Sequence, residues 1–403
     1  MITYCLFIVY KLFINCRMKL PALDEFDLRQ KMVLVRADLD VPLGRIQNSE
    51  FRIQNWEVAE RKSVNFALRN FTLNVPATLK FSKKIFSVAD DTRLRECLPT
   101  IEYLLKKNCR VILMGHLGRP EGKVVRELSL WPVAKKLRQF LDEKLKMKNE
   151  KRQLEIKNFR GFGILPDLYL IENLRFSPEE ENNDSGFAKK LADLGDFYVN
   201  ECFATSHRRH ASFVGIPKFL PHAAGFHLVK EVEVLSKVLE NPRRPVVIII
   251  GGAKEEKLKL IPQFLKIADF VLIGGWLLKR TRLRSLSFGG QSGKKIFACL
   301  TKDGKDITVK SAEKLGEIIS QGGTVVWNGP MGVYEDERDI QGTKIIAEAI
   351  VDSKALKIAG GGDTEAVIDK LGLKNKFDWI SSGGGAMLEF LAKGTLPGIE
   401  ALA

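Results

Sequence analysis

The chain has 403 residues, which is enough for two domains that each bury their own core. Its 45% hydrophobic and 28% charged residues are the composition of a soluble globular protein. The six cysteines form no C-x-x-C pair and no Cys/His group at metal spacing, which indicates free thiols in a reducing cytoplasm. The net charge of +15 leaves three kinds of partner open, namely nucleic acid, an anionic membrane surface and acidic small substrates.

Residues 1–17 form an apolar, aromatic stretch interrupted by Lys11. This stretch is too short to span a bilayer, and it lacks the charged start and the cleavage site of a signal peptide. We expect it to lie outside the functional domains, with Met18 as a second candidate for the true start.

The first half of the chain alternates apolar strands with amphipathic helices after a strand within Lys31–Pro42. Residues 46–85 interrupt this order, because they hold no sustained period of 2 or 3.6, and we interpret them as an insertion. The remaining elements expected here are helix Arg93–Lys107, strand Arg110–Met114, helix Leu128–Leu145, strand Leu168–Ile171, helix Phe187–Leu194 and strand Phe197–Asn200. This alternation predicts a parallel α/β sheet whose ligands bind beyond the carboxyl ends of the strands.

A helix over Leu228–Leu239 and the breaker cluster Asn241–Pro245 mark a domain boundary. We predict two doubly wound, Rossmann-like α/β domains, 18–227 and 243–390, with a joining helix at 228–242 and a tail, 391–403, that packs back on the first domain. The second domain should contain five strands that each end in or near glycines: Val246–Ile250, Phe270–Ile273, Thr324–Trp327, Lys357–Ala359 and Trp379–Ser381. Together these strand ends predict a phosphate-lined rim.

The stretch Ile358–Ile368 reads as a strand, three glycines and the start of a helix. Glycine allows close approach of the backbone, and the helix N-terminus favours an anion, beside which Asp363 could hold a divalent cation. The same pattern also suits an ordinary tight turn. The chain has no Walker A motif and no G-x-G-x-x-G that opens a helix in a first βαβ unit, so neither a P-loop protein nor a dinucleotide enzyme fits.

A series of short motifs, in order along the chain, resembles the phosphoglycerate kinase family from Met18 onward, except over 46–85. They are Val33–Pro42, Asp91–Arg95, Leu98–Ile101, His116–Pro120, Glu172–Phe176, Val199–Asn200, His207–Arg208, Gly251–Lys254, Trp327–Gly332, Gly360–Thr364 and Gly383–Ala386. The resemblance implies in-line phosphoryl transfer between 1,3-bisphosphoglycerate and Mg-ADP, giving 3-phosphoglycerate and ATP, after closure of two domains. It also implies a cytoplasmic monomer with these small-molecule substrates, and neither a nucleic-acid nor a membrane partner.

By resemblance, the first domain binds 3-phosphoglycerate. Arginine suits this task because its guanidinium can bind a carboxylate or a phosphate with two hydrogen bonds. The resemblance assigns Arg93 a catalytic role toward the transferring group as well. The substrate-binding candidates are Asp38, Asp40, Arg93, His116, Arg119, Arg175 and Arg208.

By resemblance, the second domain binds Mg-nucleotide, with Asp363 as the metal ligand. Phosphoryl transfer depends on positioning and charge neutralisation, for which lysine and backbone N–H groups serve. The catalytic candidates here are Lys254, Gly362 and Gly385. The nucleotide-binding candidates are Lys257, Gly274, Asn328, Gly329, Pro330, Glu335, Gly360, Gly361, Gly362, Asp363 and Thr364.

Some positions depart from the family pattern. Asp40 replaces an asparagine and places a negative charge beside an anionic substrate, which should weaken binding unless Arg208 or another neighbour compensates. Trp276 replaces a smaller residue near the adenine pocket, and the region Leu283–Gly323 is short and should lack a strand-containing segment. Two alternatives therefore stay open, an impaired relative that binds only nucleotide and, from the charge, a nucleic-acid-binding protein.

Overall fold

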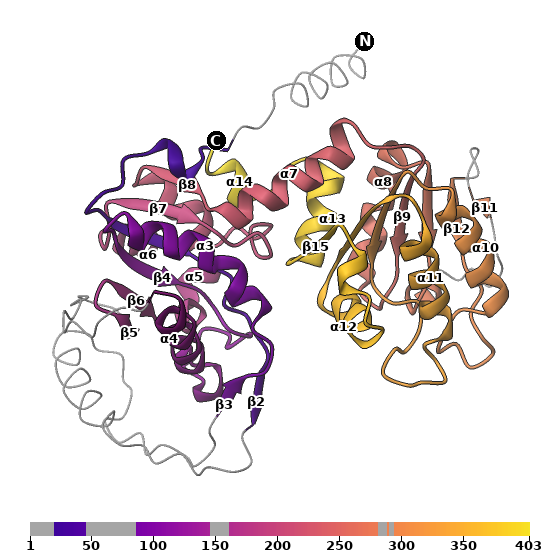
Figure 1. Cartoon of the computed structure of the whole chain (residues 1–403), viewed down its shortest axis with the longest axis horizontal. Helices are drawn as coiled ribbons and strands as arrows, with labels where there is room; N and C mark the ends of the chain where they lie inside the picture. Colours follow the sequence, from indigo (N-terminus) through magenta and orange to yellow (C-terminus); the bar gives the residue numbers. More distant parts are fainter. Residues whose placement is uncertain (1–19, 46–85, 146–160, 281–287, 290–293) are drawn as a thin grey trace. The chain divides into compact units, whose positions relative to one another are not determined.

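The computed structural model describes residues 20–45, 86–145, 161–280, 288–289 and 294–403 (Figure 1). The segments 1–17 and 46–85, on which the predictions of an extension and an insertion fall, lie outside the described residues. The chain divides into two compact units. The N-terminal unit comprises residues from Leu20–Cys202, Arg208–Val229 and Ala401–Ala403, and the C-terminal unit comprises Phe203–His207 and residues from Lys230–Glu400. The domain boundaries drawn from the sequence stay a prediction.

The N-terminal unit is built on a six-stranded sheet in the order β5-β6-β4-β1-β7-β8. All neighbours pair in parallel except β5 and β6. The strands are β1 (Met32–Arg36), β4 (Arg110–Met114), β5 (Gly161–Leu165), β6 (Leu168–Ile171), β7 (Phe197–Asn200) and β8 (His222–Ala224). A separate antiparallel pair consists of β2 (Leu43–Arg45) and β3 (Phe86–Val88). The predicted strands of this unit are confirmed, whereas β2, β3, β5 and β8 were not predicted.

The helices of this unit are α3 (Thr92–Lys106), α4 (Trp131–Leu145), α5 (Pro178–Glu181) and α6 (Ser185–Ala192). Helix α3 buries Leu94, Leu98, Ile101 and Leu104, which recur at the spacing of one helical face. Helix α6 begins two residues before its predicted start, because the Asp184 carboxylate accepts a hydrogen bond from the Phe187 N–H at 2.7 Å and caps the first turn.

The C-terminal unit has a seven-stranded sheet in the order β11-β12-β10-β9-β13-β14-β15, in which only the β11–β12 pair is antiparallel among the described strands. Its strands are β9 (Val246–Ile250), β10 (Phe270–Ile273), β11 (Phe288–Gly289), β12 (Lys295–Phe297), β13 (Thr324–Asn328), β14 (Leu356–Gly360) and β15 (Trp379–Ser381). All five residues of β9 are buried, as expected for a central parallel strand covered on both faces. The predicted α/β class with two parallel sheets is confirmed.

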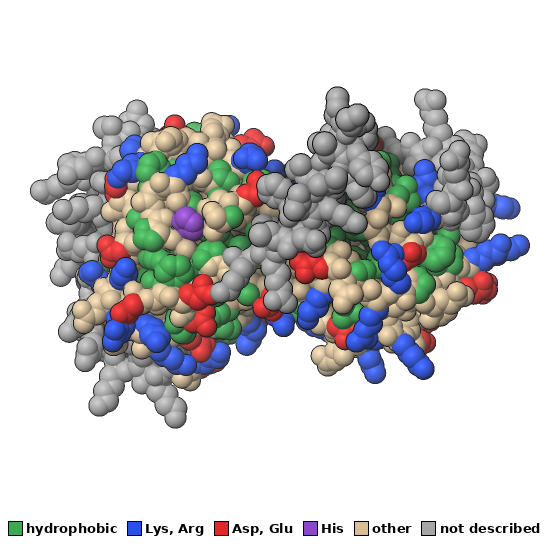
Figure 2. Space-filling model, turned by 90° about the horizontal axis from the view of Figure 1, so that it is seen from above, with side chains coloured by type: hydrophobic (Ala, Val, Ile, Leu, Met, Phe, Trp, Pro, Cys, Tyr) green, Lys and Arg blue, Asp and Glu red, His purple; other side chains and the backbone are tan. Residues whose placement is uncertain are grey.

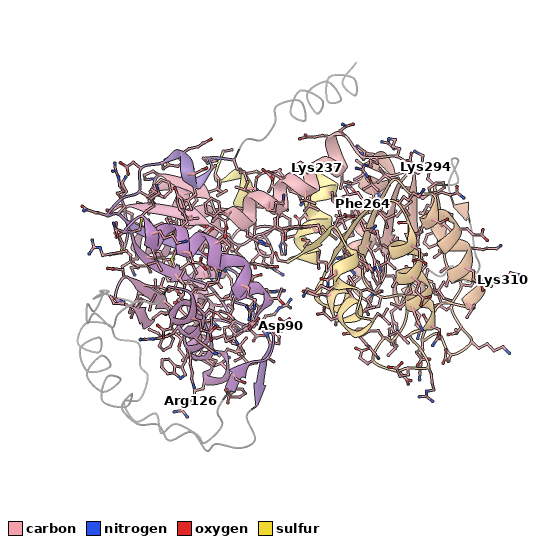
Figure 3. All side chains as sticks on the ribbon, in the orientation of Figure 1. Asp90, Arg126, Lys237, Phe264, Lys294 and Lys310 are labelled. Atoms are coloured by element: carbon pink, nitrogen blue, oxygen red, sulfur yellow. The ribbon has the colours of Figure 1, made fainter. Side chains whose placement is uncertain are left out.

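Helices cover both faces of this sheet. Figure 1 shows α8 and α13 on one side and α10 and α11 on the other. Phe264 of α8 is fully buried, while Lys310 of α10 is exposed (Figure 3). The helices are α7 (Phe226–Glu240), α8 (Ile261–Ile267), α9 (Leu277–Arg280), α10 (Val309–Ser320), α11 (Gln341–Asp352), α12 (Gly362–Lys370), α13 (Gly384–Lys393) and α14 (Pro397–Glu400).

The region Leu283–Gly323, in which we expected a strand-containing segment to be missing, still provides β12 and α10. Strand β12 pairs in parallel with β10, and α10, which packs against α11, buries Ala312, Leu315 and Ile319. The described part of this region therefore supports the sheet at its β10 edge.

Glu231 of α7 fixes the end of β15. Its carboxylate accepts hydrogen bonds from Trp379 Nε1 at 2.8 Å, from Ser381 Oγ at 3.2 Å, and from the N–H and Oγ of Ser382 at 2.7 and 2.9 Å. This buried acid is fully satisfied and determines where the following glycines, Gly383–Gly385, lie.

The described cysteines Cys97, Cys109, Cys202 and Cys299 are free thiols, as predicted. Within the described ranges, no helix has the combined length and apolar character of a membrane span.

Glu201, the residue after β7, gives a prediction for stability. Burial raises the pKa of its carboxyl to about 7, while His227 and the Thr100 hydroxyl oppose the shift. The folded state therefore holds this proton more tightly than the unfolded state. The resulting stabilisation is complete below about pH 4.5 and is lost as the pH rises toward 7. We expect the free energy of unfolding to fall through this group by about 3 kcal/mol over that range.

Urea denaturation of Glu201→Gln at several pH values tests this, because the amide cannot ionise and should remove that part of the slope. Glu240→Gln, at an exposed position, is the matched control. An unchanged pH dependence in Glu201→Gln would contradict the prediction.

Candidate functional site

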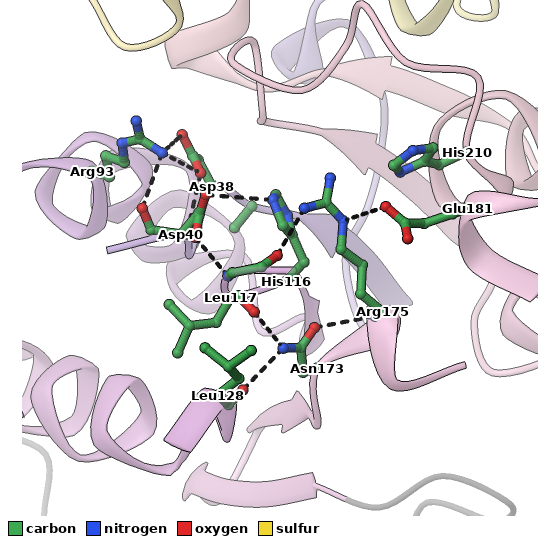
Figure 4. A network of polar contacts seen from close by, with 12 residues as sticks. Asp38, Asp40, Arg93, His116, Leu117, Leu128, Asn173, Arg175, Glu181 and His210 are labelled. Carbon is green, nitrogen blue, oxygen red and sulfur yellow. Dashed lines mark hydrogen bonds and ion pairs between the residues drawn. The ribbon is translucent and has the colours of Figure 1, made fainter. Parts of the chain in front are cut away.

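The candidate anion-binding residues of the N-terminal unit gather at the carboxyl ends of its parallel strands. Asp38 and Asp40 follow β1, His116 follows β4, and Arg175 lies in the short 3-10 helix Leu174–Phe176 after β6. Figure 4 shows these side chains together with Arg93. The structure thus brings together five of the seven residues that the resemblance placed around 3-phosphoglycerate.

Arg93 lies in the first turn of α3 and points to the end of β1. Its Nη1 donates to Asp38 Oδ1 at 3.3 Å and to the Asp40 carbonyl oxygen at 3.0 Å. Asp38 is buried, and its charge is the main cause that raises the pKa of Arg93 above the ordinary value. The guanidinium is therefore a fixed cation at this edge of the sheet.

Asp40 is held by the turn that follows β4. Its Oδ1 accepts the Gly118 N–H at 2.8 Å, and its Oδ2 lies 3.7 Å from His116 Nε2. Gly118 has a φ of 64°, and a Cβ there would lie 2.7 Å from Leu128 Cδ2, so the turn requires glycine. Neighbours other than Arg208, namely Gly118 and His116, thus partly balance the Asp40 charge.

Arg175 is almost completely buried beside the same turn. Its Nη1 donates to the Gly118 carbonyl at 2.9 Å, and its Nε lies 3.3 Å from Glu181 Oε1. Burial lowers the pKa of Arg175, and Glu181 opposes this. Asn173 fixes the segment, because its Nδ2 donates to the carbonyls of Leu117 and Leu128 and its Oδ1 accepts the Arg175 N–H.

Arg119 and Arg208 complete the set and are both exposed. Arg119 follows the Gly118 turn directly. Arg208 lies near enough to Arg175 for its charge to lower the pKa of that residue further. These two guanidinium groups are thus accessible to an anion at the same strand ends.

In the C-terminal unit, the glycine-rich strand ends interlock through hydrogen bonds. The N–H of Gly251 donates to the Asn328 carbonyl at 2.9 Å, and the N–H of Gly252 donates to the Pro330 carbonyl at 2.8 Å. The Gly329 N–H donates to Thr364 Oγ1 at 2.7 Å. The loops after β9, β13 and β14 therefore form one rim, as their sequences predicted.

Asn328 is the central residue of this rim. It is buried, and its Nδ2 donates to the carbonyls of Gly360 at 2.6 Å and Gly384 at 3.2 Å, which joins the ends of β13, β14 and β15. Gly361 has a φ of 105°, and a Cβ on Gly384 would lie 2.4 Å from the Gly361 Cα. This close backbone approach requires glycine at both positions.

Two helices begin at the rim, α12 at Gly362 and α13 at Gly384. Gly362 and Gly385 are exposed, and a Cβ on either would meet no atom within 4 Å. Free N–H groups and the positive ends of two helix dipoles therefore face open space, which suits a phosphate group.

Lys254, Lys257 and Asp363 lie within electrostatic reach of one another. Lys257 Nζ donates to the Gly251 carbonyl at 2.9 Å. Burial, with a smaller effect of Lys254, lowers the pKa of Lys257 to about 8, and Asp363 opposes the shift. Lys254 and Asp363 are exposed, so both can contact a ligand at the rim.

Asp363 fits the chemistry of a magnesium ligand. It offers one exposed carboxylate in the first turn of α12, beside the glycine N–H groups, and Mg²⁺ bound with phosphates commonly takes one or two protein carboxylates. The described residues contain no cluster of three or more His, Cys, Asp or Glu at metal-binding distance.

The remaining nucleotide candidates lie at the same rim. Gly274 follows β10, and a Cβ there would lie 2.2 Å from Met331 Sδ. Glu335 is exposed, and both it and Asp363 help raise the pKa of Tyr334, after burial. Trp276, two residues after Gly274, is 46% exposed. The roles assigned to all these residues from the sequence stay predictions.

Several polar residues that support the site were not predicted. Asn173 holds the Arg175 segment, and Arg36, Ser212 and Glu180 form a buried group beneath His116. The only sequence signal for this group is a charged residue, Arg36, at the end of an otherwise apolar strand.

The structure defines an α/β protein of two units, one basic at its strand ends and the other rimmed with glycines. The family model described as phosphoglycerate kinase matches residues 63–289 and 290–394. The chain belongs to the phosphoglycerate kinase family. The match includes residues 63–85, the later part of the segment predicted as an insertion.

Individual relatives agree. The chain is 40% identical to phosphoglycerate kinase of Moorella thermoacetica, over 94% of this chain and 98% of the relative, and 40% identical to that of Dictyoglomus turgidum, over 94% and 97%. Among solved structures, it is similar to phosphoglycerate kinase from Coxiella burnetii, with a TM-score of 0.66 and 29% identity over 95% of this chain and 98% of that chain. The structure from Pyrococcus horikoshii gives 0.69 and 26% over 94% and 98%.

Asn328→Asp tests whether the rim depends on one amide. The change removes two hydrogen bonds and turns a carboxylate toward two carbonyl oxygens, so we expect a loss of about 3 kcal/mol in the free energy of unfolding. ADP affinity should fall with it. Denaturant unfolding and calorimetric titration measure both quantities, and Asn375→Asp at an exposed position is the control. Unchanged stability and ADP affinity would show that the amide does not hold the rim.

Proposed function

We propose that the chain catalyses reversible phosphoryl transfer between 1,3-bisphosphoglycerate and ADP. The observation that carries the proposal is that each unit gathers groups suited to an anion at the carboxyl ends of its strands, arginines in one unit and glycine-rich helix N-termini in the other. The names of the relatives support the same reaction.

The acceptor in the reverse direction is then a carboxyl group. In the forward direction a β-phosphate oxygen of ADP forms a new bond to the transferred phosphorus. The bond from that phosphorus to the carboxyl oxygen breaks, and 3-phosphoglycerate leaves as a carboxylate. No protein atom needs to bond to the phosphorus, so positioning and charge neutralisation account for catalysis.

In the N-terminal unit, Arg119, Arg175 and Arg208 bind the anionic groups of the triose, and Arg93 neutralises charge on the transferring group. Asp38, Asp40 and His116 orient the substrate. The fixed position of Arg93 against Asp38 supports this role, because a guanidinium held before substrate arrives needs no reorganisation during transfer.

In the C-terminal unit, Gly360, Gly361, Gly362, Thr364 and Gly385 surround the nucleotide phosphates, and Lys254 stabilises the transferring phosphoryl group. Asp363 would hold Mg²⁺, which when bound neutralises phosphate charge. Lys257, Gly274, Asn328, Gly329, Pro330 and Glu335 form the remainder of the nucleotide site. The open space beside Gly362 and Gly385 supports this arrangement.

We further propose a cytoplasmic monomer that acts on small molecules. Free thiols in the described cysteines suit a reducing compartment. On the face seen in Figure 2, Lys and Arg side chains are spread over both units among acidic ones, which favours small anionic substrates over a nucleic-acid surface.

A coupled assay with purified protein tests the reaction. We expect turnover with 3-phosphoglycerate and Mg-ATP, and a loss of at least about a hundredfold in kcat in Lys254→Ala and in Arg93→Ala, because each removes a charge that stabilises the transition state. Lys310→Ala, at an exposed site on α10, is the control. Folded wild-type protein that binds ADP but shows no turnover would favour the nucleotide-only alternative.

Asp40→Asn gives a second, independent test. Asparagine can still accept the Gly118 N–H, but it removes a negative charge from an anion site. We expect KM for 3-phosphoglycerate to fall about fivefold, with kcat and KM for ATP nearly unchanged. Asp193→Asn, at an exposed position directly after α6, is the control. A raised KM would mean that the Asp40 charge itself helps to organise the site.

A further inference from the structure

Arg36, the last residue of β1, is a fully buried cation that is not itself among the substrate-binding candidates. Its Nε donates to Ser212 Oγ at 3.0 Å, its Nη1 donates to the Ala37 carbonyl at 2.6 Å, and its Nη2 lies 2.9 Å from His116 Nδ1. Its guanidinium carbon also lies 4.5 Å from the centre of the Phe213 ring. The side chain is therefore fixed on every side.

We propose that Arg36 is a positioning residue that holds His116 as the neutral tautomer with its proton on Nε2. A guanidinium has only donors, so the ring nitrogen that faces it must accept. The proton of the neutral ring then lies on the other nitrogen. His116 would present Nε2–H to an oxygen of the substrate, a role that rests on the proposed function, whereas the tautomer itself does not.

The surroundings of His116 oppose a second proton. A charged ring would turn Nδ1–H toward the Arg36 N–H and place two cations in contact. Burial lowers the pKa of His116 well below its ordinary value, and Arg36, Arg175, His210 and Arg93 lower it further. On the open side, Asp40 Oδ2 lies 3.7 Å from Nε2 and attracts the proton that the neutral ring carries there.

Ser212 and Glu180 also fix the position of Arg36. Ser212 Oγ donates to Glu180 Oε1 at 2.5 Å and the Ser212 N–H donates to Oε2 at 3.0 Å, so Ser212 Oγ is free to accept from Arg36. Arg36 thus donates both to His116 Nδ1 and to Ser212 Oγ, and Ser212 donates in turn to Glu180. His116 is consequently a fixed donor, and it cannot serve as a base toward the substrate.

The test uses long-range proton–nitrogen NMR on the ligand-free, ¹⁵N-labelled protein, which has five histidines to assign. We expect His116 to show a bare Nδ1 and a protonated Nε2 with no titration between about pH 5.5 and pH 8. His222 is an internal control, because its Nδ1 lies 2.8 Å from the Leu220 carbonyl and must donate, which gives the opposite tautomer. A protonated Nδ1 in His116, or titration near the ordinary pKa, would overturn the proposal.

Arg36→Met and Arg36→Lys extend the test. In Arg36→Met we expect a mixture of His116 tautomers and a rise of about tenfold in KM for 3-phosphoglycerate, with ADP affinity unchanged, whereas Arg36→Lys keeps a donor and should restore much of both. If Arg36→Met does not fold, the wild-type spectrum still decides. If His116 shows the expected tautomer but the protein has no turnover, only the proposed function is refuted. If His116 shows the opposite tautomer in an active protein, only this inference is refuted.

Discussion

Parallel strand pairing is the constraint on which the site of each unit depends. In a parallel sheet, the carboxyl ends of neighbouring strands meet at one edge, so residues far apart in the chain become neighbours. In the N-terminal unit this brings Asp38, His116 and Arg175 together from the ends of three strands. In the C-terminal unit it aligns five glycine-containing loops, and the Asn328 amide then binds three of them to one another.

The sequence predicted most of this arrangement because the signals were local. Short continuous runs of β-branched residues such as Val246–Ile250 favour covered strands, and the glycines after them mark where the backbone comes close. Strands β5 and β8 were among those missed, because neither consists of a continuous apolar run. The antiparallel β5 begins with Gly161–Phe162–Gly163, and β8 has three residues, His222–Ala224, so pairing with neighbours rather than composition makes both into strands.

The supporting residues of the site could not be predicted for a different reason. Arg36 and Ser212 are 176 positions apart, and Asn173 bonds to carbonyls 45 and 56 positions away. No local sequence pattern shows which arginine will be buried beside a hydrogen-bond acceptor from a distant part of the chain. The contact residues of a site can therefore be found from motifs, whereas the residues that fix their protonation and direction need the three-dimensional structure.

The charges at the N-terminal strand ends also show what binding must change. Arg93 is paired with Asp38, and Arg175 with Glu181, so part of the charge of each arginine is already balanced. An anion that binds there can use the remaining N–H groups of each guanidinium, and where it displaces one of these acids only the difference between the two interactions contributes to affinity. The charges of Arg119 and Arg208 are exposed to water, so an anion that binds them displaces water rather than a carboxylate. Affinity for the anion should thus come chiefly from those two, while the paired arginines supply geometry.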